Sequence, residues 1–198
     1  MPRSLALFDF DGTITTKDTF IEFIRFVKGD VAVGVGFVLL APILVAYKLR
    51  LIPNWRAKEI VFGYFFKNML YTDFEEYGQR FATEALPKLL RKSAIHEILK
   101  LAAEKWEIFI VTASAAEWIR PWSEPYSITL LATKWEVIDG KITGRIEGKN
   151  CYGEEKSARI QKETDLNSFT EIYAYGDTKG DREMLALATK KHYRFFGA

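Results

Sequence analysis

The chain has 198 residues, of which 48% are hydrophobic and 27% charged, so it can bury the core of one domain together with an insertion. Its formal net charge of only +2 gives no support for a nucleic-acid-binding groove. The single cysteine, Cys151, excludes an intramolecular disulfide framework and fits a reducing compartment, so we expect a cytoplasmic protein.

The predicted elements alternate between strand and helix, except in one long helical stretch. Ser4–Asp9 predicts a buried strand, and residues from about 17 to 91 predict helices, with breaks near Gly29, Pro53, Tyr71 and Pro87. Further strands are predicted at Glu107–Val111, Ser127–Leu131, Trp135–Ile138, Lys141–Ile146, Glu171–Gly176 and Tyr193–Phe196, and further helices at Ala94–Lys105, Ala116–Trp122, Glu154–Glu163 and Asp181–Ala188.

This alternation predicts an α/β fold, a doubly wound parallel sheet with a Rossmann-like core and an inserted α-helical domain. The expected division is an α/β core of residues 1–16 and 92–198 and a helical insert of residues 17–91.

One stretch of the insert, residues 31–47, has no charged side chain, and its 17 residues lie at the lower limit of a membrane span. A single crossing would place Asp9 and Asp177 on opposite sides of a bilayer, so we do not expect one. We expect instead a buried or partly exposed helix of the insert. The alternative is an interfacial helix that rests on lipid and makes the protein membrane-associated.

Two short acidic motifs follow apolar strands near opposite ends of the chain. The first is Asp9-Phe10-Asp11-Gly12-Thr13, and the second is Gly176-Asp177-Thr178-Lys179-Gly180-Asp181. Open α/β folds bind ligands at the carboxyl edge of the sheet, where both motifs would meet. Clustered carboxylates repel one another unless a cation lies among them, and oxygen ligands favour a hard ion such as Mg²⁺.

The first motif resembles that of the haloacid dehalogenase-like phosphohydrolases. Thr112 or Ser114, Lys156 and Gly176–Asp181 resemble the later motifs, in the family's order. The resemblance covers the whole chain except the insert, which lies where the phosphoserine phosphatase-like branch carries its helical cap. It implies a Mg²⁺-dependent phosphomonoester hydrolase that works through an aspartyl-phosphate.

By this resemblance, Asp9 is the nucleophile, and Asp11 protonates the leaving alcohol and then activates water. The Asp9 carboxylate, the Asp11 backbone carbonyl and Asp177 would bind Mg²⁺, and Asp181 would orient the site or bind the ion through water. Lys156 would stabilise Asp9 and the transferring phosphoryl group.

The residues that hold the phosphate and the rest of the substrate stay open. Thr112 is favoured for the phosphoryl oxygens because it lies nearer the strand end, with Ser114 as its rival. Asp18 occupies the place of an acidic substrate-recognition residue, and it is equally a helix N-cap. Arg56, like Lys58, either reaches an anionic substrate or is solvated.

The first functional hypothesis is a phosphatase of a small phosphorylated metabolite. The insert is unusually apolar, at residues 31–47, Phe62, Tyr64, Phe65 and Phe66, and in this it resembles family members that act on lipid-linked phosphates. The alternative is therefore the same chemistry on a lipid head group at a membrane surface. A non-catalytic binding protein is disfavoured because every catalytic position is filled, and phosphoryl transfer to an acceptor other than water is left open.

Overall fold

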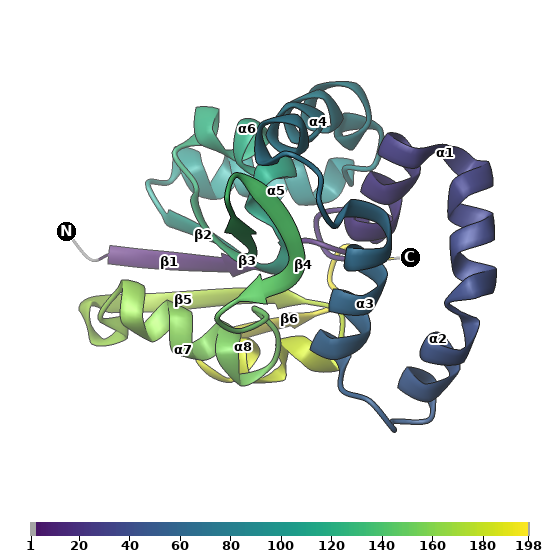
Figure 1. The fold of residues 1–198 in the computed structure, drawn as a ribbon. Coiled ribbons are helices and arrows are strands. Elements are labelled where there is room, and N and C mark those ends of the chain that lie inside the picture. The colour runs from purple at the N-terminus through teal and green to yellow at the C-terminus, as the bar shows by residue number, and fades with distance from the viewer. Residues whose placement is uncertain (1–2, 198) are drawn as a thin grey trace.

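A six-stranded sheet forms the centre of the computed structural model, which describes residues 3–197 (Figure 1). The strands are β1 (Arg3–Phe8), β2 (Glu107–Ala115), β3 (Thr129–Ile138), β4 (Lys141–Glu147), β5 (Phe169–Gly176) and β6 (Lys190–Tyr193). Their order is β4-β3-β2-β1-β5-β6, and every neighbouring pair is parallel except β3 and β4, which form an antiparallel hairpin at one edge. The predicted α/β fold with a mainly parallel sheet is confirmed.

Helices cover both faces of this sheet (Figure 1). On one side lie α5 (Lys92–Ala103) and α6 (Arg120–Ser123), and on the other lie α7 (Glu154–Glu163) and α8 (Arg182–Ala186). The central strand β1 is buried on both sides: Ala6 and Phe8 pack in the cluster that includes α5, whereas Leu5 and Leu7 pack in the cluster of α7 and α8. Burial on both faces explains why β1 is a continuous apolar run.

The helical insert lies between β1 and β2 in sequence and at the carboxyl ends of the parallel strands in space (Figure 1). It comprises α1 (Thr19–Leu39), α2 (Ala41–Lys48), α3 (Asn54–Phe66), α4 (Tyr71–Glu84) and the 3₁₀ turn η1 (Leu86–Lys88). Asp18 caps α1 through hydrogen bonds from the backbone N–H groups of Phe20 and Ile21, as the sequence predicts. Further 3₁₀ turns are η2 (Ala116–Trp118), η3 (Glu124–Tyr126), η4 (Leu166–Ser168) and η5 (Lys179–Asp181).

Aromatic stacking and a close backbone approach fix the insert to the sheet. The ring of Phe62 on α3 stacks on Trp135 of β3 with centroids 3.4 Å apart, and Phe23 on α1 stacks on Trp118 at 4.4 Å. A Cβ atom on Gly144 of β4 would lie 2.7 Å from the Cα atom of Gly63, so only glycine permits this approach. The insert and one face of the sheet therefore share a single hydrophobic cluster.

The outer part of the insert is a partly exposed helical segment, one of the two forms that the sequence predicts for residues 31–47. Gly29 interrupts α1 with φ 79°, and α2 is bent by 63° from α1. Val33, Gly36 and Leu40 face inward, but most apolar side chains of residues 31–47 are exposed or half-buried. Among residues 3–197 no single helix is long and apolar enough to cross a membrane, although α1 and α2 together would meet that length and composition as a bent pair.

Two strand predictions need correction. The predicted strands 127–131 and 135–138 are one strand, β3, because its first half pairs with β2 and its second half pairs with β4. The predicted strand 193–196 lies earlier, at Lys190–Tyr193, because Arg194 has φ 53° and ends it. Phe195 and Phe196 then fold back onto the ring of Tyr175.

Candidate active site

Strand register brings the two acidic motifs to one place. Phe8, the last residue of β1, is paired with Ile110 of β2 and with Tyr175 of β5. The residues that follow these three positions therefore emerge side by side at the carboxyl edge of the sheet. Asp9 continues the ladder through its backbone N–H, which donates to the Tyr175 carbonyl at 2.9 Å.

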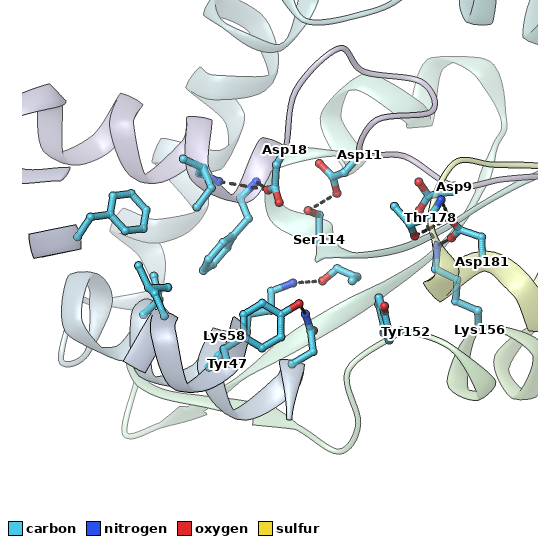
Figure 2. Close-up of a pocket in the computed structure, with 18 residues that line it drawn as sticks. Asp9, Asp11, Asp18, Tyr47, Lys58, Ser114, Tyr152, Lys156, Thr178 and Asp181 are labelled. Atoms are coloured by element: carbon cyan, nitrogen blue, oxygen red, sulfur yellow. Dashed lines mark hydrogen bonds and ion pairs between the residues drawn. The ribbon is translucent and has the colours of Figure 1, made fainter. Parts of the chain in front are cut away.

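A buried lysine links the two motifs. Lys156 is in the first turn of α7, and its side chain is almost completely buried. Its ammonium group lies 2.5 Å from Asp9 Oδ1 and 2.7 Å from Asp181 Oδ1 (Figure 2). A buried ammonium between two carboxylates is expensive to form unless all three groups are held in place, so this trio is a built feature of the fold.

The Asp181 side chain organises the loop after β5. Its second oxygen, Oδ2, accepts hydrogen bonds from the backbone N–H groups of Asp177 at 3.2 Å and Thr178 at 2.9 Å, and from the Thr178 hydroxyl at 2.8 Å. With Lys156 on Oδ1, both Asp181 oxygens already have donors. Asp181 is therefore suited to positioning its neighbours more than to binding an ion directly.

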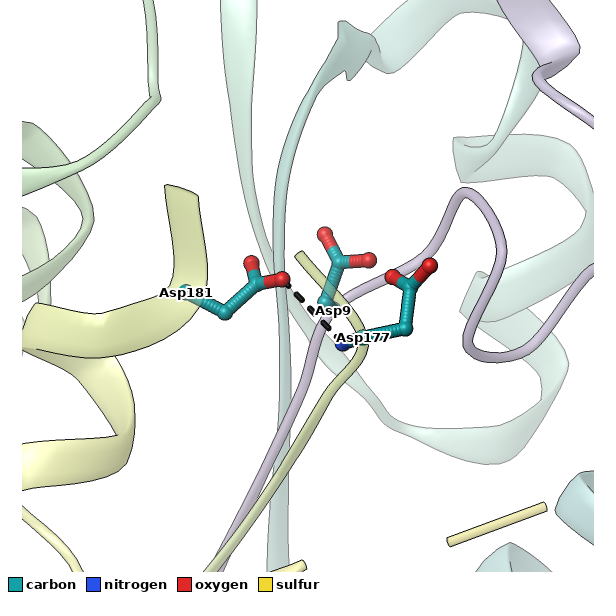
Figure 3. A group of neighbouring side chains, drawn as sticks. All are labelled: Asp9, Asp177 and Asp181. Carbon is teal, nitrogen blue, oxygen red and sulfur yellow. Dashed lines mark hydrogen bonds between the residues drawn. The ribbon is translucent and has the colours of Figure 1, made fainter. Parts of the chain in front are cut away.

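Three carboxylates form a group with the dimensions of a cation site. Asp9, Asp177 and Asp181 each offer one oxygen, and these oxygens lie within 4.8 Å of one another (Figure 3). Gly12 makes room for the group: its φ is 85°, and a Cβ atom there would lie 2.5 Å from Asp177 Oδ2. The Thr13 hydroxyl donates to Asp177 Oδ1 at 3.2 Å. The oxygen donors fit Mg²⁺, with Asp9 and Asp177 as the carboxylates free to bind it.

One ammonium group, that of Lys156, faces the three carboxylates of this group, so negative charge is in excess. Burial raises the pKa of Asp9 to about 8, against the pull of Lys156 and with the help of the Asp181 and Asp11 carboxylates. Burial and Asp181 also raise the pKa of Asp177. Burial alone would lower the pKa of Lys156, but Asp9 and Asp181 hold it above its usual range. Added positive charge beside Asp9 and Asp177 would favour their ionised forms.

The Asp11 carboxylate points away from the three carboxylates of Asp9, Asp177 and Asp181 and toward the insert. Its Oδ1 accepts from the backbone N–H and the hydroxyl of Thr19, both at 2.6 Å. Its Oδ2 accepts from the Ser114 hydroxyl at 2.6 Å (Figure 2). The indole N–H of Trp118 in turn donates to the Thr19 hydroxyl at 3.1 Å. These bonds hold Asp11 at the wall of the same cavity that Asp9 lines.

The two hydroxyls after β2 have different surroundings. Thr112 is fully buried, and its hydroxyl accepts from the Ser114 backbone N–H at 3.0 Å and reaches Asp11 Oδ2 only at 3.4 Å. Ser114 lines the cavity, whereas Thr112 does not. Of the two candidates for the phosphoryl oxygens, Ser114 is therefore the one that faces the space where a ligand would lie.

A cavity of about 270 Å³ opens between the sheet edge and the insert (Figure 2). Its polar end is formed by Asp9, Asp11, Ser114, Lys156, Thr178 and Asp181. The insert contributes the apolar side chains of Phe20, Ile21, Phe37, Leu44, Ala57 and Val61, together with Asp18, Tyr47, Asn54 and Lys58. The cavity is therefore amphipathic, with charge at the sheet and hydrocarbon at the insert.

The structure brings Asp18 and Lys58 into the cavity but leaves Arg56 outside. Arg56 is exposed and forms an ion pair with Glu59 at 3.1 Å, which agrees with the solvated alternative that the sequence leaves open. The Lys58 ammonium donates to the Ala113 carbonyl at 2.5 Å, and burial lowers its pKa. Asp18 both caps α1 and lines the cavity, so its two predicted roles are compatible.

Several residues of the site were not predicted from the sequence, among them four with hydroxyl or aromatic side chains. Thr19 and Trp118 hold Asp11, while Tyr47 and Tyr152 form part of the cavity wall. Hydroxyl and aromatic side chains of these kinds are common at structural positions, so no pattern in the sequence distinguishes them. Tyr152 lies in the loop before Lys156, and its ring packs directly against Gly180.

The sequence is similar to one protein family and to a curated relative over most of its length. The family model described as haloacid dehalogenase-like hydrolase matches residues 6–186. Protein CicA of Caulobacter vibrioides is 34% identical over 194 residues, which cover 97% of this chain and 86% of CicA.

Solved structures resemble the fold. A protein of unknown function from Bordetella pertussis Tohama I has a TM-score of 0.83 at 23% identity, covering 96% of this chain and 89% of that one. A structure described as the phospho-aspartyl intermediate analogue of phosphoserine phosphatase has a TM-score of 0.63 at 21% identity, covering 99% of this chain and 90% of that one. At these identities the likeness shows the fold alone.

Proposed function

Because the chain belongs to the haloacid dehalogenase-like hydrolases, we propose that it is a Mg²⁺-dependent phosphomonoester hydrolase working through an aspartyl-phosphate on Asp9. The observation that carries the proposal is the buried trio of Asp9, Lys156 and Asp181 beside Asp177, at the polar end of a cavity. The stability of the fold does not require four charged side chains to meet at the edge of the sheet. Clusters of buried charged side chains with shifted pKa values commonly mark a catalytic site.

In the first step, an Asp9 carboxylate oxygen attacks phosphorus and the bond from phosphorus to the leaving oxygen breaks. Asp11 gives its proton to that oxygen, so an alcohol leaves and not an alkoxide. The Lys156 ammonium and the Ser114 hydroxyl offset the charge on the transferring group. A Mg²⁺ ion held by Asp9, Asp177 and the Asp11 carbonyl would supply the positive charge that lets a carboxylate approach a phosphate dianion.

In the second step, Asp11 accepts a proton from water, and the resulting nucleophile attacks the aspartyl-phosphate. The acyl phosphate bond breaks, inorganic phosphate leaves and the Asp9 carboxylate returns. The hydrogen bonds from Thr19 and Ser114 keep Asp11 at the cavity wall for both proton transfers. The helical insert acts as a cap that closes the cavity and excludes water.

The first candidate substrate is a small phosphorylated metabolite whose polar groups meet Asp18 and Lys58. The second is a phosphate ester of a lipid, and the apolar wall of Phe20, Phe37 and Leu44 favours it. A panel containing phosphoserine, sugar phosphates and long-chain alkyl or lipid phosphates distinguishes them. Selective turnover of the long-chain members would support the second candidate, and their rejection would eliminate it.

The proposed chemistry is tested with a soluble aryl phosphate and Asp9→Asn. Wild-type protein should turn over this substrate with Mg²⁺ and lose that activity in excess chelator. The variant should lose about four orders of magnitude or more in kcat, because an amide is a far weaker nucleophile. Asp30→Asn, an exposed change of the same kind, should leave turnover intact. Undiminished turnover in chelator or in Asp9→Asn would contradict the proposal.

A further inference from the structure

The outer edge of the insert carries an apolar surface that the fold leaves exposed. We call residues 31–55 the outer arm; it contains the second part of α1, α2 and the turn into α3 (Figure 1). Val31 is 83% exposed, Val38 is 75% and Leu51 is 73%. The other exposed large apolar residues of the arm are Val35, Leu39, Val45, Tyr47, Leu49 and Trp55.

The arm helix is apolar on both sides. Val33, Gly36 and Leu40 recur at helical spacing and are buried against the insert. Val31, Val35 and Val38 follow the same spacing on the exposed side of α1. A surface helix in water normally has a polar outer face, so a second apolar stripe indicates an apolar partner.

The charges of this region indicate which partner. Residues 31–58 contain no Asp or Glu and four basic residues, of which Lys48 and Arg50 are exposed at the end of α2. Of the nearest carboxylates along the chain, Asp30 is paired with Arg25 at 2.8 Å and Glu59 with Arg56 at 3.1 Å. A hydrocarbon face flanked by unopposed positive charge matches the boundary between anionic head groups and acyl chains.

The arm is also continuous with the cavity. Phe37, Leu44 and Tyr47 line the cavity, whereas their neighbours Val38, Leu39 and Val45 are exposed. The arm therefore forms a wall with the cavity on one side and solvent on the other. Exposed positions are mainly aliphatic, with few of the aromatic residues that protein interfaces favour.

We propose that the outer arm docks on the surface of an anionic lipid bilayer. Val31, Val38 and Leu39 enter the boundary between head groups and acyl chains, and Lys48 and Arg50 contact lipid phosphates. The proposal concerns binding and stands whether or not the chain hydrolyses a lipid phosphate. If the proposed function holds, docking places the cavity at the membrane surface.

Flotation of the full-length protein with vesicles tests this proposal. Phosphatidylcholine vesicles containing phosphatidylglycerol should carry the protein upward, and vesicles of phosphatidylcholine alone should carry much less. The double variant Val38→Ser/Leu39→Ser should reduce the partition coefficient by at least about tenfold, because less hydrocarbon is buried. Lys48→Gln and Arg50→Gln should each reduce it about fivefold on anionic vesicles only.

Two controls separate docking from misfolding and from catalysis. Leu99→Ser/Ile138→Ser changes two exposed apolar residues outside the arm and should float like wild type. Asp9→Asn should also float like wild type, because docking does not need turnover. Val38→Ser/Leu39→Ser should keep its circular dichroism and its turnover of a soluble aryl phosphate, since neither side chain lines the cavity.

Three results would overturn the proposal. The first is no flotation with either kind of vesicle. The second is equal loss of flotation in the arm and control variants. The third is a dimer in light scattering that becomes a monomer in Val38→Ser/Leu39→Ser, which would identify the arm as a contact between copies of the chain.

Discussion

The carboxyl edge of the sheet and the outer arm differ in where their side chains find partners. At the edge, Asp181 alone accepts hydrogen bonds from Lys156, the Thr178 hydroxyl and two backbone N–H groups. On the arm, Val31 and Val38 remain mostly exposed. A cluster whose partners lie inside the chain can be interpreted from its own contacts, whereas an exposed apolar face points to a partner outside the chain.

After Asp9→Asn, the largest loss of activity at the carboxyl edge should come from Asp11→Asn. The amide keeps the shape of the carboxylate but cannot exchange a proton, so kcat should fall about 10²–10⁴-fold. Steady-state kinetics on an aryl phosphate measures the loss. Asp139→Asn, at the exposed hairpin turn, is the matched control and should keep the wild-type rate. A loss confined to KM would argue against proton transfer by Asp11.

Removal of the buried Lys156 ammonium should show how much its ion pairs with Asp9 and Asp181 contribute to the stability of the fold. Lys156→Met leaves Asp9 and Asp181 without their shared cation, and the free energy of unfolding should fall by about 3–5 kcal/mol. Lys149→Met removes an exposed lysine whose ammonium is 4.0 Å from Glu155, and it should cost at most about 1 kcal/mol. Urea unfolding of both variants compares them. Equal small losses would mean that the trio is not held as tightly as the distances indicate.

Stability should depend on pH through Asp9 when no divalent ion is added. The pKa of Asp9 rises from 3.8 to about 8 in the fold, so the folded state binds the extra proton. This stabilisation is full below about pH 4 and is lost as pH rises through about 8. Mg²⁺ should reverse the trend by favouring the carboxylate, giving a larger increase in melting temperature at pH 8 than at pH 5. Asp9→Asn should lose this pH dependence; an unchanged profile would contradict the assignment.

The smallest effect distinguishes the two basic residues of α3. Lys58 lines the cavity, so Lys58→Gln should lower kcat/KM on the preferred substrate of the panel by about tenfold. Arg56 is exposed and pairs with Glu59, so Arg56→Gln should change it less than about twofold. The reverse order would mean that the insert adopts another arrangement when substrate binds.

The edge was more predictable from the sequence than the arm, for physical reasons. Neighbouring parallel strands end at the same edge of the sheet, so two apolar runs that are followed by Asp9 and Asp177 imply one site. The capping role of Asp18 follows from hydrogen bonds within its own helix turn. Periodicity cannot say which helical residues meet a distant strand, so it could not choose Lys58 over Arg56.

Tertiary contacts decided the remaining differences. The uncharged stretch 31–47 is compatible with burial or exposure, and only the 63° bend and the packing of α3 determine which side chains stay outside. Strand β3 continues through the buried Thr133, whose hydroxyl donates to Asn150 at 3.0 Å, and at this point its pairing changes from β2 to β4. Such a change of partner has no local sequence pattern.

The identity of the residue that carries phosphate during turnover tests directly whether Asp9 is the nucleophile. Protein mixed with a rapidly hydrolysed phosphate ester and Mg²⁺ should be quenched in acid within the first turnover, digested and mapped by mass spectrometry. We expect a phosphoryl group on the peptide that contains Asp9, and none on that peptide in Asp9→Asn. A phosphoryl group on Asp11, Ser114 or another residue, with Asp9 unmodified in active enzyme, would contradict that assignment.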